Sequence, residues 1–283
     1  MVSENGKVSE NRIWKSLKKI FWINLTTTCV YLFYSLLLST LQYFIKGSAN
    51  YYDIFMPKHF WMNLLLSHPY VFTLWYLVAY MQVLFIIWLF VQFKCFSWLL
   101  KVFPVFFIIG LLMGSYNIWS PFENLCYHRN FLTMGLPFVL LGSWIKVNQK
   151  QCLSSFNKMP FLILLAISLT LSYIEYAVVR LILHTSGDYC LTTIILSTVV
   201  FLYCIRTPNF GKDKKIIHKL TIIGRDFSLF LYLYHILVQE ILGLIAYKSG
   251  ISFSNYEYFI VLFFTLSIGI SIKSIRSLHY KNR

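Results

Sequence analysis

Charged residues are scarce in this chain of 283 residues, and acidic residues are the scarcest of them. Asp, Glu, Lys and Arg together make up 12% of the sequence, and only 10 residues are acidic. A typical soluble protein is about 25% charged. Because 58% of the residues are hydrophobic, the polar surface is too small to cover a soluble core of this size. The composition therefore excludes a soluble enzyme, a disordered chain and a secreted disulfide scaffold.

Closely spaced metal-ligating residues are also lacking. The six cysteines form no CxxC pair and no Cys/His cluster with the spacing of a zinc site. Most of them lie in or beside apolar segments, where cysteine behaves as a small hydrophobic residue. We therefore expect no metal cofactor.

What the sequence has instead is a series of long apolar segments. A helix that crosses a bilayer needs roughly 17 to 25 apolar residues. About eight segments qualify, although the fourth and sixth are short: 20–45, 70–92, 99–116, 130–146, 160–183, 189–205, 222–247 and 256–272. They predict an all-α, polytopic transmembrane helix bundle. The loop at about 46–69 contains a shorter apolar stretch, which favours an interfacial or re-entrant half-helix.

Lys and Arg are concentrated on one side of this predicted bundle. About four-fifths of them lie before the first span, in alternate loops or in the C-terminal tail. Because positive residues are enriched on the cytoplasmic side, we expect both termini to be cytoplasmic. The net charge of +15 then needs no nucleic-acid partner. The predicted organisation is a basic cytoplasmic segment over 1–19, a membrane domain over 20–272 and a cytoplasmic tail over 273–283.

Ionisable side chains inside the predicted spans are candidates for function, because they are costly to place in a bilayer. In the seventh span Ser228, Tyr232, His235 and Gln239 share one helix face, and the His235 imidazole can act as an acid or base or bind a ligand. In the fifth span Glu175 lies well inside the apolar segment. The structural alternatives are a histidine satisfied by a neighbouring helix and an intramembrane ion pair of Glu175.

Basic residues at the ends of two spans are further candidates. Arg129 stands at the outer end of the fourth span, where it can extend to the membrane interface or bind an anionic group of a substrate. Four residues precede the first span, where they can anchor the cytoplasmic side or bind a phosphate group: Arg12, Lys15, Lys18 and Lys19.

Four stretches are similar to the motifs of a known family, and they occur in the family's order. Leu74-Trp75-Tyr76-Leu77, after His68, is similar to an HLWYL motif at the start of a span. Arg129 to Gly142 resembles an RN-x-LF-x-GLPFFLLG span, and Gly224 to His235 resembles a G-x-x-S-x-x-x-YLLH span. Arg12 to Phe21 is similar to a basic cytoplasmic stretch before a third span. The chain therefore resembles the acyltransferase-3 family of integral-membrane acyltransferases.

This resemblance implies a multi-pass enzyme of the cell membrane that transfers an acyl group. The donor implied is cytoplasmic acetyl-CoA or another acyl-CoA, and the acceptor is a hydroxyl of an external cell-surface glycan or lipid-linked saccharide. The four basic residues at 12–19 are then expected to bind the CoA phosphates. His235 and Glu175 are the expected catalytic residues, and the substrate is expected to meet Arg129, Trp75, Tyr76 and Tyr232.

The chain departs from the family pattern at its N-terminus. Members normally have ten spans, with a catalytic histidine in the first, and this sequence begins just before the family's third span. We therefore expect it to lack two helices and that histidine, so that it is truncated or inactive, or is completed by a second copy or another protein. The alternative function is a transporter or export component for a polysaccharide or small metabolite, with Glu175 and His235 along the path.

Overall fold

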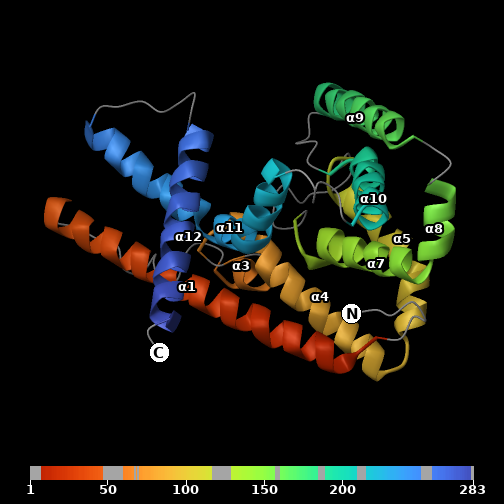
Figure 1. Ribbon diagram of the computed structural model, residues 1–283, viewed down its shortest axis with the longest axis horizontal. Coiled ribbons are helices and arrows are strands. Elements are labelled where there is room, and N and C mark those ends of the chain that lie inside the picture. Colours follow the sequence, from red (N-terminus) through yellow and green to blue (C-terminus); the bar gives the residue numbers. More distant parts are fainter. Residues whose placement is uncertain are drawn as a thin grey trace. The chain divides into compact units, whose positions relative to one another are not determined.

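The structure is a computed structural model, and every regular element that it describes is a helix (Figure 1). The described residues are 8–46, 60–66, 68, 70–116, 129–156, 160–183, 189–208, 215–249 and 257–281. No strand occurs within these ranges, so the all-α prediction is confirmed. The chain divides into two compact units, residues 1–208 and residues 209–283, each of which is described by itself below.

The first unit contains most of the helices. The α-helices are α1 (Glu10–Lys46), α3 (Phe60–Leu66), α4 (Trp75–Gln92), α5 (Phe96–Met113), α7 (Leu136–Val147), α8 (Gln149–Phe156), α9 (Phe161–Val178) and α10 (Leu191–Arg206). Three short elements of other helical types adjoin them: the 3₁₀ turn η1 (Phe72–Leu74) and the π-helices η2 (Phe131–Gly135) and η3 (Val179–Leu183). The second unit consists of α11 (Lys215–Ser249) and α12 (Glu257–Lys281).

Six of the described helices are long and apolar enough to cross a membrane. They are α1, α4, α5, α9 with the first residues of η3, α11 and α12. The expected fourth and sixth spans are present as shorter apolar helices, Phe131–Val147 and Leu191–Arg206. The membrane-helix character is therefore confirmed, while the number of crossings and the orientation stay predictions. The seven-residue α3 lies in the loop where a half-helix was expected, and its place at a membrane interface stays a prediction.

Helix α1 begins at Glu10, well before the apolar segment that starts at residue 20. The early start follows from packing, because Ile13 is completely buried against the core of the first unit. The basic residues predicted for a separate segment therefore lie on the first turns of α1. Helix α8 lies in a loop for which no element was predicted.

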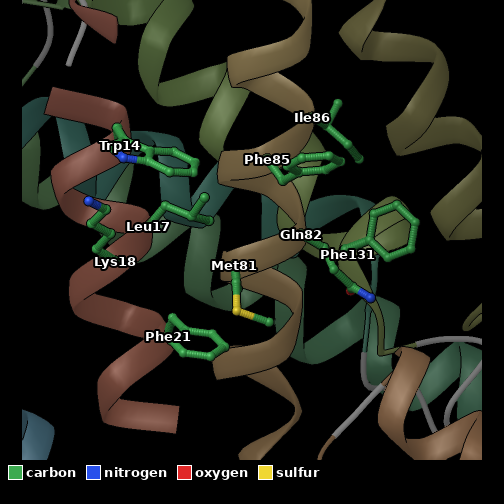
Figure 2. A pocket seen from close by; sticks show the side chains of 9 residues that line it. All are labelled: Trp14, Leu17, Lys18, Phe21, Met81, Gln82, Phe85, Ile86 and Phe131. Atoms are coloured by element: carbon green, nitrogen blue, oxygen red, sulfur yellow. The ribbon is translucent and has the colours of Figure 1, made fainter. Parts of the chain in front are cut away.

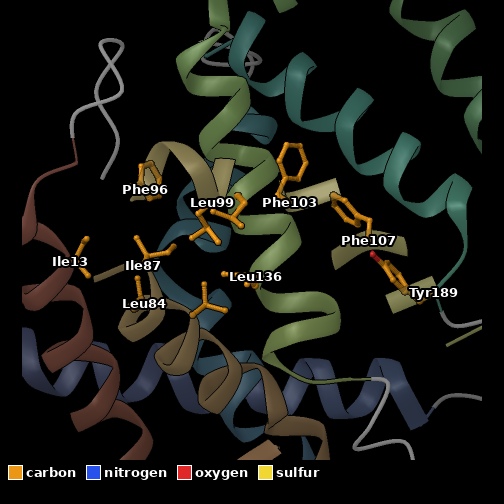
Figure 3. Close-up of a cluster of buried hydrophobic side chains, with 11 residues drawn as sticks. Ile13, Leu84, Ile87, Phe96, Leu99, Phe103, Phe107, Leu136 and Tyr189 are labelled. Carbon is orange, nitrogen blue, oxygen red and sulfur yellow. The ribbon is translucent and has the colours of Figure 1, made fainter. Parts of the chain in front are cut away.

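The core of the first unit lies among α4, α5 and α7 (Figure 3). Helix α1 packs along α4, and η2 packs against both α4 and α5, while α9 pairs with α10. The buried residues of this core are Ile13, Val83, Leu84, Ile87, Phe96, Leu99, Phe103, Phe107, Leu136, Leu140 and Tyr189. Their burial supplies the main hydrophobic stabilisation of the unit.

The π-helix η2 is held by a side-chain cap and by two close helix contacts. The Asn130 side chain accepts hydrogen bonds from the backbone N–H groups of Leu132 (2.8 Å) and Thr133 (3.1 Å). A Cβ atom at Gly110 of α5 would lie 2.5 Å from the Thr133 carbonyl oxygen, and one at Gly135 would lie 2.9 Å from Val83 of α4. Glycine at these two positions therefore lets η2 fit between α4 and α5.

In the second unit α11 packs against α12. A Cβ atom at Gly269 of α12 would lie 3.1 Å from the Phe227 ring, so the two helices approach closely there. Polar contacts also join them: Lys273 pairs with Asp226 at 2.5 Å, and the Gln239 amide donates to the Glu257 carboxylate at 2.8 Å.

Candidate functional site

A cavity of about 600 Å³ lies between α1 and α4 in the first unit (Figure 2). Pockets that bind small molecules typically measure about 300–1,000 Å³. Its walls come from two helices and from Phe131 of η2, and the lining residues are Trp14, Leu17, Lys18, Phe21, Met81, Gln82, Phe85, Ile86 and Phe131. We call it the α1–α4 cavity.

Two polar side chains contribute to the α1–α4 cavity. The Lys18 ammonium lies 5.5 Å from the centre of the Trp14 ring, a distance typical of a cation–π contact. The Gln82 amide nitrogen donates to the Leu65 carbonyl oxygen of α3, while its amide oxygen is buried without a hydrogen-bond partner among the described residues. Both residues belong to the lining, but the surface that the cavity exposes is apolar.

His68, in the turn between α3 and α4, is completely buried. Its Nδ1 accepts hydrogen bonds from the backbone N–H groups of Tyr70 (3.3 Å) and Val71 (3.2 Å), and its Nε2 lies 3.2 Å from the Thr28 hydroxyl of α1. Since Nδ1 is an acceptor, Nε2 carries the proton and donates it to Thr28. His68 precedes α4, and burial lowers its pKa to about 4, so the ring is neutral at neutral pH.

The predicted residues at the start of α1 and α4 lie on different parts of the first unit. Arg12, Lys15, Lys18 and Lys19 are all exposed on α1, and of these Lys18 lines the cavity. Trp75 and Tyr76 begin α4, and their rings meet edge to face at 6.1 Å. Neither aromatic side chain is part of the cavity lining.

Glu175 of α9 fixes the N-terminus of α10. Its two carboxylate oxygens accept hydrogen bonds from the backbone N–H groups of Leu191 (3.0 Å) and Thr192 (2.8 Å), and one of them also accepts from the Thr192 hydroxyl. A carboxylate is favourable there, because the first N–H groups of a helix have no partner within it. Arg180, in contrast, donates to the Tyr176 hydroxyl at 2.9 Å.

His235 and Tyr232 belong to α11 in the second unit, and Arg129 and Glu175 belong to the first. The His235 Nδ1 lies 3.0 Å from the carbonyl oxygens of Leu231 and Tyr232, which requires that Nδ1 carry a proton. In the neutral ring Nε2 is then the acceptor, which is the state of a general base. Arg129 is half-buried and directly precedes the Asn130 cap of η2.

The sequence missed His68 as a site residue and gave no role to Gln82. The position of His68 shortly before the LWYL motif was the only feature of the sequence that could have indicated it. Within the described residues, no group of three or more His, Cys, Asp or Glu side chains could hold a metal ion.

A family model described as an acyltransferase domain, that of the acyltransferase-3 family, matches residues 3–273. The match includes residues of both units, from the basic start of α1 to α12. In comparisons with curated proteins and with solved structures, nothing matches the chain significantly.

Proposed function

Since this chain belongs to the acyltransferase-3 family, we propose that it transfers an acyl group from cytoplasmic acetyl-CoA or another acyl-CoA to a hydroxyl of an external cell-surface glycan or lipid-linked saccharide. The family match over residues 3–273 carries this proposal. The six apolar helices fit a protein that works within a membrane, and we propose that it crosses the cell membrane several times.

The donor side of the proposal is supported by the basic start of α1. Arg12, Lys15, Lys18 and Lys19 are exposed within a short stretch of one helix, and CoA carries phosphate groups that such side chains bind. Lys18 also belongs to the lining of the α1–α4 cavity, so the basic stretch of α1 lies beside an apolar pocket.

The chemistry proposed for His235 is general base catalysis. The acceptor hydroxyl oxygen attacks the thioester carbonyl carbon, its proton passes to His235 Nε2, the carbon–sulfur bond breaks, and the proton then goes to the CoA sulfur. The contact of His235 Nδ1 with the Leu231 carbonyl oxygen supports this role, because it holds the required tautomer. We propose that Arg129, Trp75, Tyr76 and Tyr232 bind the acceptor.

Glu175, which was expected as a second catalytic residue, is assigned a different role. Both of its oxygens are engaged at the N-terminus of α10, so we propose that it positions this helix and takes no part in proton transfer.

The experiment that tests the function is incorporation of labelled acetyl into surface glycan by the full chain in membranes. His235→Ala is expected to lower the rate at least about 100-fold, as loss of a general base does. His218→Ala, an exposed histidine on the same helix, is the matched control. Unchanged acetylation in His235→Ala would remove this residue from the mechanism. Export of unmodified glycan without consumption of acyl-CoA would favour the transporter instead.

A further inference from the structure

A smaller pocket of about 130 Å³ lies between α11 and α12 in the second unit. The surface that it exposes is partly polar, unlike that of the α1–α4 cavity. Among its described lining residues two have polar side chains, Gln239 of α11 and Glu257 of α12, and we call it the α11–α12 pocket. At this size it accommodates part of a ligand, such as one edge of a sugar ring, since sites that enclose whole small molecules measure about 300–1,000 Å³.

The hydrogen bond between these two side chains determines what the pocket offers to a ligand. The Gln239 amide nitrogen donates to one Glu257 carboxylate oxygen at 2.8 Å. Because an ionised carboxylate only accepts, the Gln239 amide must turn its nitrogen toward Glu257. The described residues provide no hydrogen-bond partner for the amide oxygen or for the second carboxylate oxygen. The pocket therefore offers two acceptors, and its ligand must carry hydrogen-bond donors.

Hydroxyl groups are the donors that suit this pair of acceptors. A hard metal ion takes about six or more oxygen ligands, which is more than these two side chains supply. Two neighbouring hydroxyl groups of a saccharide can each donate to one of the two oxygens. The hydrogen bond to the carboxylate is strengthened by its charge, so Glu257 is expected to contribute more than Gln239.

The α11–α12 pocket continues the helix face that carries the proposed base. Gln239 follows His235 by one turn of α11, about 6 Å along the helix axis. A sugar whose hydroxyl reaches His235 can therefore place other hydroxyls of the same ring near Gln239 and Glu257. These residues lie where α11 approaches its end and α12 begins, and the expected orientation puts this part on the outer side, where the acceptor is expected.

We propose that Gln239 and Glu257 bind hydroxyl groups of the acceptor close to the one that is acylated, and so select a saccharide over a simple alcohol. The inference rests on the proposed function and adds two acceptor-binding residues to it. It also gives a role to Gln239, which shares its helix face with Tyr232 and His235.

The test measures transfer of labelled acetyl from acetyl-CoA by the full chain in phosphatidylcholine nanodiscs. The acceptors are the methyl glycosides of glucose, galactose, mannose and N-acetylglucosamine, together with cyclohexylmethanol, which has a ring of the same size and a single hydroxyl group. The kcat/KM for the best glycoside is expected to exceed that for cyclohexylmethanol at least about tenfold, which is the effect of one hydrogen bond to a charged group.

Glu257→Leu is expected to lower this ratio of kcat/KM values at least about tenfold, because it removes the carboxylate. Glu240→Leu makes the same replacement at an exposed residue of α11 outside the pocket lining, and it should keep the ratio of the unmodified chain. The ratio does not depend on the amount of folded protein. A contact that only joins α11 to α12 would therefore lower both rates alike, and an unchanged ratio in Glu257→Leu overturns the inference.

The remaining outcomes separate this inference from the function on which it rests. Equal kcat/KM for the glycosides and cyclohexylmethanol overturns the inference and leaves the acyl transfer standing, as does transfer to surface glycan but to none of the glycosides. Faster transfer to aminocyclohexylmethanol than to any glycoside identifies an ammonium group as the ligand and also overturns it. Absence of transfer to every acceptor, surface glycan included, contradicts the proposed function itself.

Discussion

The Nε2 atom of His68 lies 3.2 Å from the hydroxyl of Thr28, a residue forty positions earlier in the chain. This contact joins the turn before α4 to the middle of α1. The Thr28 hydroxyl in turn donates to the Asn24 carbonyl oxygen at 2.8 Å. The imidazole therefore receives two backbone N–H groups on one side and donates on the other, which fixes where the turn meets α1.

A lower pH is expected to destabilise the folded first unit because protonation of the buried His68 is unfavourable. Because burial lowers its pKa from 6.5 to about 4, the unfolded chain binds more protons than the folded chain between these values. The contribution of the neutral His68 to the free energy of unfolding is complete above pH 6.5. It decreases as the pH is lowered toward 4, by up to roughly 3 kcal/mol. Thermal unfolding between pH 7.5 and pH 4.5 measures the effect. His68→Gln keeps a donor and an acceptor without titrating, so its curve should be flatter, and an equally steep curve would refute the assignment.

Removal of the Glu175 carboxylate is expected to loosen the N-terminus of α10. Glu175→Ala leaves the backbone N–H groups of Leu191 and Thr192 without their acceptors, at a cost of about 1–3 kcal/mol. Ser172→Ala on the same helix is the control, because its buried hydroxyl has no hydrogen-bond partner among the described residues and its loss should be nearly neutral. Unfolding followed by intrinsic fluorescence compares the two variants. Equal stabilities would contradict the capping role.

A methyl group at Gly110 is expected to force α5 away from η2. The added carbon would lie 2.5 Å from the Thr133 carbonyl oxygen, and overpacking of this kind costs about 1–3 kcal/mol. Gly224→Ala in α11 is the matched control, because apart from the helix's own nearby backbone no described atom lies within 4 Å of a Cβ atom there. The control should be neutral or more stable by about 0.5–1 kcal/mol, since alanine favours a helix. Equal melting temperatures for both variants would rule out the close contact.

Loss of a single basic side chain at the start of α1 is expected to weaken donor binding in a salt-dependent manner. Lys15→Gln or Lys19→Gln should raise the KM for the acyl-CoA about two- to fivefold at low ionic strength, which is the range of one exposed charge pair. The difference should shrink as salt is added, because exposed charges are screened. Lys219→Gln, an exposed residue of α11, is the control. A salt-independent increase in KM would argue against contact with phosphate.

The length of apolar segments predicted most of the helices, because a bilayer demands both length and low polarity. Helices α4, α5 and α9 begin and end within a few residues of the expected spans. Helix α8 was not predicted, because it is polar and contains no apolar segment. The early start of α1 depends on the burial of Ile13, which is a tertiary contact.

The site was harder to predict than the helices, because its residues meet through distant contacts. The sequence suggested Glu175 for chemistry, since a carboxylate within an apolar segment has no visible reason to be there. Its partners on α10 appear only once α9 and α10 are paired. The α1–α4 cavity was not predicted at all, since it depends on which faces of the two helices meet. Lys18 was singled out for its charge, and the structure places it in the cavity wall.

The π-helix η2 sets the rotational register of everything that follows it in α7. A π turn holds one residue more than an α turn, so the residues of α7 are rotated by about 100° from where an unbroken α-helix would put them. Phe138 consequently meets the Phe107 ring of α5 at 5.2 Å. A deletion of one residue within 131–135 would turn Phe138 away from α5. The packing around the core would then change, although none of the buried core residues would be replaced.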